Sequence, residues 1–236
     1  CSHFPGDRPC KYHKAEGIKC DACGYYNPVR QKILIIKFDA LGDVLRTTAL
    51  LPSLKRRYPG AHVTWLTKAA ARDLFVNNPF VHEVLTCEDP TTIARLQSQT
   101  YDILIHPDAS ATSAAYAALA RAKTRLGFGL NELGKVYPFN AEAEEWFEMG
   151  AFDDLKKKNT KTYQQVIHEI AGLQGSNSEI VVNLTEKEKA WAQAFVQKHQ
   201  LYRYDFVVGL NTGAGGRWKY KKWTFEGYRD LIGELE

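Results

Sequence analysis

The pattern of apolar and polar positions predicts an α/β fold over most of the chain. Residues 33–36 (Ile-Leu-Ile-Ile) are apolar on both faces, which is typical of a parallel strand that helices cover on each side. Over residues 44–58 the apolar positions recur at helical spacing, so we expect one helix there. Other segments predict strands at residues 103–105 and 206–210, and helices at residues 186–199 and 225–235.

Length and composition indicate how large a core the chain can bury and which charge its ligands carry. The chain has 236 residues, of which 44% are hydrophobic, enough to bury a substantial core and to form more than one unit. The 31 Lys and Arg against 27 Asp and Glu leave a formal net charge of +4, which favours anionic ligands without requiring nucleic acid as a partner. Apolar runs are short and no leader pattern is present, so we expect a cytoplasmic protein.

The turn after the first predicted strand, FDALGD, places acidic and basic side chains where open α/β sheets bind their ligands. Asp43 lies at the start of the next helix, where the alternative is a helix N-cap. Asp39 either raises the pKa of Asp43 by like-charge repulsion or caps the turn. Lys37 and Arg46 flank the turn and either hold an anionic ligand or are ordinary surface cations. The turn lacks GxGxxG, which argues against a dinucleotide oxidoreductase.

A second glycine-rich turn follows the predicted strand at residues 206–210. It includes Thr212, Gly213 and Gly215, whose backbone amides can approach phosphate oxygens closely. Lys221 lies shortly after it and either binds phosphate or belongs to a solvated loop. His106 ends the strand at residues 103–105 and is either a ligand contact or a structural histidine. The segment at residues 142–152 is either a lid or an amphipathic helix on the core.

Five segments together resemble glycosyltransferase family 9, the lipopolysaccharide heptosyltransferases and their relatives. They are KILIIKFDALGDVLRTTALL at the first strand, YDILIH at residues 101–106, RLGF at 125–128, VGLNTGA at 208–214 and KKW at 221–223. The resemblance implies the GT-B architecture, with two similar Rossmann-like domains facing each other across a cleft. It also implies that Asp43 is the catalytic base. Donor contacts would come from Thr212, Gly213, Gly215 and Lys221, and acceptor contacts from Lys37, Arg46 and His106.

The implied activity is inverting, metal-independent transfer of a sugar, for example heptose from ADP-heptose, to a lipopolysaccharide-like or other surface-glycan acceptor. Peripheral contact with the inner face of the membrane is part of the same expectation. We expect three parts: an extension at residues 1–30, an acceptor-side domain at 31–184, and the beginning of a nucleotide-sugar domain at 185–236. The chain is then either truncated or a short relative without donor binding. The alternative function is a non-catalytic, zinc-stapled α/β module that binds an anionic glycan or nucleotide.

The extension is rich in cysteine. Cys20 and Cys23 form a CxxC, and Cys10 and Cys1 precede it, with His13 as an alternative fourth ligand. A CxxC beside a second pair of soft ligands predicts a tetrahedral, structural zinc site, with an iron-sulfur cluster as the alternative ion. Disulfides and inert thiols are the other readings, although a cytosolic chain has little reason to keep disulfides oxidised.

Overall fold

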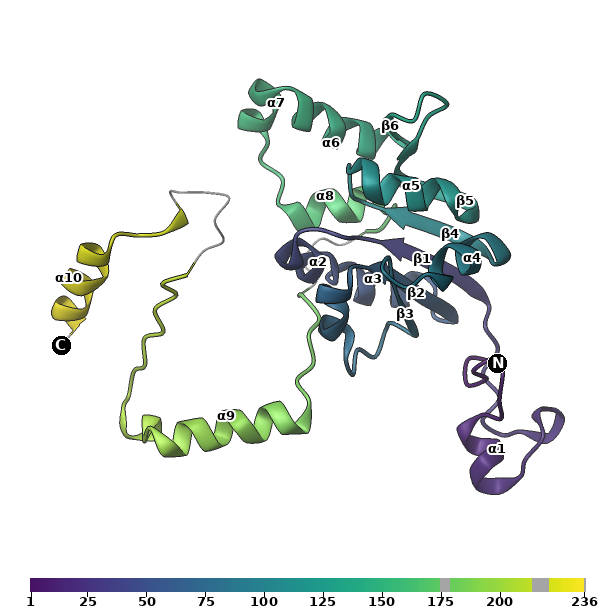
Figure 1. The fold of residues 1–236 in the computed structure, drawn as a ribbon, viewed down its shortest axis with the longest axis horizontal. Coiled ribbons are helices and arrows are strands. Elements are labelled where there is room, and N and C mark those ends of the chain that lie inside the picture. Colours follow the sequence, from purple (N-terminus) through teal and green to yellow (C-terminus); the bar gives the residue numbers. More distant parts are fainter. Residues whose placement is uncertain (175–178, 214–220, 236) are drawn as a thin grey trace. The chain divides into compact units, whose positions relative to one another are not determined.

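The computed structural model describes residues 1–174, 179–213 and 221–235, which form two compact units, Cys1–Thr185 and Glu186–Glu236. The first unit contains a six-stranded sheet in the order β3-β2-β1-β4-β5-β6 (Figure 1). Five strands are parallel, and β6 pairs with β5 in the antiparallel direction. The predicted parallel α/β sheet is confirmed. Its strands are β1 Gln31–Ile36, β2 Ala61–Thr67, β3 Glu83–Thr86, β4 Thr100–His106, β5 Arg121–Leu130 and β6 Val136–Pro138.

Two hydrophobic cores lie on opposite faces of the sheet. Ile33 and Ile35 of β1 pack with residues of α2, α3 and α8, whereas Leu34 and Ile36 pack with residues of α4 and α5. All four side chains are fully buried, as expected for a strand covered on both faces. The helices of this unit are α1 Lys11–Glu16, α2 Leu41–Thr47, α3 Leu50–Arg57, α4 Thr91–Ser98, α5 Ala111–Leu119, α6 Ala141–Ala151, α7 Asp153–Lys158 and α8 Tyr163–Ile170, with 3-10 helices η1 Cys20–Ala22 and η2 Ala69–Phe75.

The prediction of a single helix at residues 44–58 is wrong. The segment forms two helices, α2 and α3, with a break at Thr48 and Ala49. Pro52 explains the break. In a continuous helix its ring would clash with the carbonyl of Thr48, and it has no N–H to donate to that oxygen. The Thr48 carbonyl instead accepts from the backbone N–H of Leu51 at 3.0 Å. Proline is tolerated in the first turn of α3, because a backbone N–H at that position would have no partner within the helix.

The second unit contains the two predicted helices, α9 Glu186–Lys198 and α10 Phe225–Leu235, and the 3-10 helix η3 Leu201–Arg203. The strand expected at residues 206–210 is wrong: the described part of this unit contains no strand, and Phe206 is 80% exposed. A strand needs a neighbour to satisfy its backbone hydrogen bonds. The described residues of this unit provide no such neighbour.

Candidate active site at the carboxyl edge of the sheet

The central strands β1 and β4 are parallel neighbours, and the strand order reverses between them. Their carboxyl ends therefore form the edge at which α/β sheets of this kind bind ligands. Lys37 follows β1 and Asp108 follows β4, and their side chains meet there, with Nζ 3.3 Å from Oδ1. Both are nearly buried, with side chains 6% and 14% exposed. The reading of Lys37 as an ordinary surface cation is thus wrong.

Asp43 lies in the first turn of α2, but it does not cap the helix. The N-cap residue is Ala40, and no side chain makes a capping hydrogen bond. The Asp43 carboxylate instead accepts from Arg46 Nη1 at 3.2 Å, and 41% of its side chain is exposed. The N-cap interpretation of Asp43 is therefore wrong. The site presents an accessible carboxylate beside a guanidinium group.

Asp39 does not cap the turn either. Its carboxylate pairs with Lys68 Nζ at 2.6 Å, in a partly exposed ion pair that joins the end of β1 to the end of β2. Hydrogen bonding to the Asp39 carboxylate raises the pKa of Lys68. The negative charge of Asp39 is thus balanced by this lysine.

Sequence reasoning missed Tyr163 and Thr47, which support the position of Arg46. The Tyr163 hydroxyl lies 2.9 Å from Thr47 Oγ1, and the Arg46 guanidinium stacks over the Tyr163 ring at 4.1 Å from its centroid. Burial raises the pKa of Tyr163 to about 12, so its hydroxyl keeps its proton at neutral pH. No local signal connects Tyr163, at the start of α8, with α2, more than one hundred positions earlier.

His106 belongs to the interior of this edge. Its Nδ1 lies 2.7 Å from the backbone oxygen of Phe128, whereas its buried Nε2 has no hydrogen-bond partner among the described residues. Burial lowers the pKa of His106 to about 4, so the ring is neutral at pH 7. With Nδ1 as donor to Phe128, Nε2 is an acceptor. Contact of His106 with an acceptor molecule stays a prediction, as does the same role for Lys37 and Arg46.

Gly127 allows β5 to lie directly beside His106. The two residues are paired in the β4–β5 register, and Gly127 has φ +95°. A Cβ at this position would overlap the backbone carbonyl of His106. Only glycine accepts both this conformation and this close approach.

The lowered pKa of His106 predicts a loss of stability in mild acid. In the unfolded chain His106 takes up a proton as the pH falls through about 6.5, while the folded chain resists protonation down to about 4. The unfolded state therefore binds more protons in this window, and the free energy of unfolding decreases as the pH falls. We expect His106 to contribute a loss of about 2 kcal/mol between pH 7 and pH 5.

Urea denaturation at both pH values measures this change. His106→Asn keeps a side-chain donor near the Phe128 carbonyl and removes the titration, so its stability should change clearly less over the same window. An equal change in the variant would assign the acid sensitivity to other groups, such as His62, His82 and His168, whose pKa values burial also lowers.

A cavity of about 580 Å³ lies next to the residues that follow β4. Ala109, which comes directly after Asp108, lines it together with residues of α6, Lys156 of α7 and the residue that follows α7: Trp146, Phe147, Met149, Gly150, Ala151, Lys156 and Asn159. The segment predicted at residues 142–152 is indeed helical, as α6, and it buries Ala143 and Met149. It thus packs on the core and also forms a wall of this cavity. A lid movement stays a prediction.

The predicted donor-binding residues lie in the second unit. Thr212, Gly213 and Lys221 are exposed, and Gly213 N donates to Asn211 Oδ1 at 3.1 Å. Gly215 lies outside the described residues. Their role in donor binding stays a prediction.

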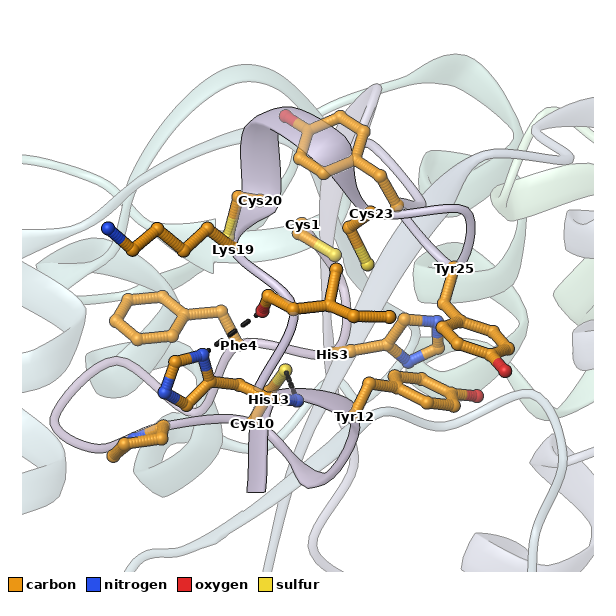
Figure 2. A pocket seen from close by; sticks show the side chains of 13 residues that line it. Cys1, His3, Phe4, Cys10, Tyr12, His13, Lys19, Cys20, Cys23 and Tyr25 are labelled. Atoms are coloured by element: carbon orange, nitrogen blue, oxygen red, sulfur yellow. Dashed lines mark hydrogen bonds between the residues drawn. The ribbon is translucent and has the colours of Figure 1, made fainter. Parts of the chain in front are cut away.

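The predicted metal ligands line one pocket in the N-terminal segment (Figure 2). Cys1, Cys10, Cys20 and Cys23 surround it together with His13, and all of these cysteines are free thiols. In the described parts of the chain, no three His, Cys, Asp or Glu side chains are already arranged as a metal site. Zinc binding stays a prediction.

Comparison with solved structures identifies the fold. A glycosyl transferase of family 9 from Veillonella parvula DSM 2008 superposes with a TM-score of 0.62 at 18% identity, over 87% of this chain and 60% of that protein. An E. coli ADP-heptose LPS heptosyltransferase II gives a TM-score of 0.53 at 20% identity, over 86% of this chain and 61% of that protein. No protein-family model and no curated protein matches the sequence.

The likeness defines a Rossmann-like α/β fold of the kind found in GT-B glycosyltransferases. At these identities it establishes the fold alone. The chain spans about three fifths of the length of these two proteins. Within the described residues, no helix is both long and apolar enough to cross a membrane.

Proposed function

We propose that the chain is the acceptor-side part of an inverting glycosyltransferase that uses a nucleotide-diphosphate sugar. One observation carries the proposal: Asp43 presents a solvent-accessible carboxylate at the carboxyl edge of the sheet, beside Arg46, in a fold shared with solved glycosyltransferases. An accessible carboxylate is what a general base needs, because it must reach a hydroxyl of the incoming substrate.

In the proposed reaction the Asp43 carboxylate accepts the proton of the acceptor hydroxyl. The acceptor oxygen attacks the anomeric carbon of the donor, and the bond from that carbon to the diphosphate breaks on the opposite face. The nucleoside diphosphate leaves with the bonding electron pair, so the configuration at the anomeric carbon inverts. No metal ion takes part in this scheme. Positive charge and backbone N–H groups near the departing diphosphate would stabilise its developing charge.

The proposed acceptor site is the cavity beside Ala109, next to the residues that follow β4. Its aromatic wall from α6 suits the apolar faces of sugar rings, and Lys156 supplies N–H donors. The cationic Lys156 favours an anionic acceptor, such as a phosphorylated or acidic surface glycan. Heptose from ADP-heptose and a lipopolysaccharide-like acceptor are the proposed substrates, by analogy with the heptosyltransferase that shares the fold.

The test is a screen of the full-length protein against a panel of nucleotide sugars, with and without candidate glycan acceptors. We expect transfer from one donor class, release of the corresponding nucleoside diphosphate, and a product of inverted configuration, with full activity in the presence of a chelator. Binding of nucleotide sugars without any turnover would instead support the non-catalytic binding module.

Lys221→Ala in the full-length protein should weaken donor binding. A charge-assisted contact to phosphate contributes more than a neutral hydrogen bond, so we expect the donor KM to rise by about tenfold. Initial-rate kinetics with varied donor measures it. Because Lys222 is also exposed, Lys222→Ala serves as the matched control and should change the KM much less. An equal donor KM for the wild type and Lys221→Ala would mean that Lys221 belongs to a solvated loop and does not bind the donor.

A further inference from the structure

The N-terminal segment, residues 1–30, has defined secondary structure but no hydrophobic core. It contains α1 and η1, and none of its residues is buried. A segment of this size cannot gain enough from apolar burial to offset the entropy of ordering its backbone. Such segments depend on a metal ion or on disulfides. The cysteines here are free thiols, and thiols are groups that a structural metal ion can use as ligands.

The segment brings four cysteines to one pocket of about 370 Å³ from three separate stretches of chain. Cys10 is the N-cap residue of α1, Cys20 begins η1, and Cys23 follows its end. Figure 2 shows these side chains and Cys1 gathered around the pocket.

A backbone and a side-chain hydrogen bond hold Cys1 near the CxxC. Ser2 N donates to the Asn27 oxygen at 2.8 Å, and Asn27 Nδ2 donates to Ser2 Oγ at 2.9 Å. Asn27 lies only four positions after Cys23, and Tyr26 N donates to the Cys23 oxygen at 3.1 Å. The beginning of the chain is thus fastened to the segment that leaves the CxxC, although Cys1 is far from Cys23 in sequence.

Two of the sulfur atoms accept backbone hydrogen bonds. His13 N donates to Cys10 Sγ at 3.5 Å, and Asn27 N donates to Cys1 Sγ at 3.4 Å. These contacts hold the sulfur atoms of Cys10 and Cys1 in place at the pocket. The thiolate is the form that binds metals.

We propose that Cys1, Cys10, Cys20 and Cys23 bind one zinc ion as four thiolates, and that this site holds the N-terminal segment in its fold. Zinc prefers tetrahedral sulfur coordination in closed structural sites. In the described residues these side chains are not already arranged as a metal site, so zinc binding requires the four sulfurs to move closer together. Each thiol releases its proton to solvent as its bond to zinc forms.

The proposal selects Cys1 rather than His13 as the fourth ligand. The Nδ1 atom of His13 lies 3.0 Å from the backbone oxygen of Ile18, and its backbone N–H already supports Cys10. Cys1 is chosen because the hydrogen bonds between Ser2 and Asn27 hold it beside the segment that follows Cys23. An Nδ1–H that donates to Ile18 leaves His13 Nε2 free to bind a metal ion, so His13 is the alternative ligand. Four sulfurs complete a tetrahedral shell without it.

The test is metal analysis of the chain, purified under reducing conditions without chelator. We expect about one zinc per chain in the wild type, and loss of most of it in Cys20→Ser, Cys23→Ser and Cys1→Ser. Cys87→Ser is the matched control and should keep its zinc, because Cys87 does not line the pocket. Burial raises the pKa of the Cys87 thiol to about 11, so it stays protonated at neutral pH.

Thiol labelling of the wild type provides a readout that does not depend on how the variants fold. The four pocket thiols should react slowly with a thiol reagent while zinc is bound, and rapidly after a chelator removes it. Absence of metal in the wild type, or thiols that react equally fast with and without chelator, would overturn the proposal.

Two further outcomes would also overturn it. A brown protein that contains iron and inorganic sulfide would show that the cluster holds iron rather than zinc. Zinc that is retained in Cys1→Ser and lost in His13→Ala would show that the ligand set is wrong.

Discussion

Replacing Asp43 with Asn in the full-length protein is expected to lower kcat by about 10²- to 10⁴-fold, the usual cost of losing a general base. Asn keeps the oxygen that accepts from Arg46 Nη1 but cannot take a proton from the acceptor hydroxyl. Because Asp43 neither caps α2 nor is buried, the variant should fold normally. Initial-rate kinetics and circular dichroism measure the two effects.

Asp39→Asn is the matched control for this prediction. Asp39 follows the same strand and is also partly exposed, but its carboxylate is engaged by Lys68. We expect its effect on kcat to be far smaller. If the folded Asp43→Asn variant transfers sugar at nearly the normal rate, Asp43 is not the base and the proposed mechanism is wrong.

Lys37→Met is expected to lower the free energy of unfolding by about 3 kcal/mol, the lower end of the range for breaking a buried ion pair. The substitution leaves the Asp108 carboxylate nearly buried without its partner, and in the described part of the chain its Oδ2 already lacks a hydrogen bond. Met fills a similar volume, so the loss reports the charge rather than a cavity. Urea denaturation at pH 7 measures it.

Two comparisons separate the charge effect from packing. The double variant Lys37→Met with Asp108→Leu removes both charges and should recover most of the lost stability. Lys68→Met breaks the more exposed pair with Asp39 and should have a much smaller effect. A Lys37→Met variant as stable as the wild type would mean that the pair contributes nothing to folding.

Part of the fold of the first unit followed from local patterns. The run at residues 33–36 predicted a strand buried on both faces, and β1 divides these residues between two cores. Hydrophobic periodicity predicted the wrong structure at two places, one with a proline inside the helical pattern and one without a neighbouring strand. Pro52 splits the helix expected at residues 44–58, and the apolar segment at 206–210 has no described strand to pair with.

The candidate site was predicted only in part. The sequence indicated that Asp43 and Lys37 follow a strand at the ligand-binding edge, because that position depends on local chain order. It did not indicate that Lys37 is buried against Asp108, or that Tyr163 supports Arg46. Both contacts join residues from distant elements, and neither has a signal in the intervening sequence.

The sequence by itself therefore determined the class of the fold, the buried strand β1, the helices α9 and α10, and the polar groups that follow β1 and β4. Hydrophobic periodicity and turn residues depend on neighbouring positions in the chain, so they can be recognised in the sequence without the tertiary structure. Only the tertiary structure decided which of these groups are exposed, which are paired and which are neutral. The placement of β4 beside β1 buries Lys37 and His106 while leaving Asp43 accessible. Burial and pairing depend on every element packed around a side chain, and this information is distributed over the whole chain.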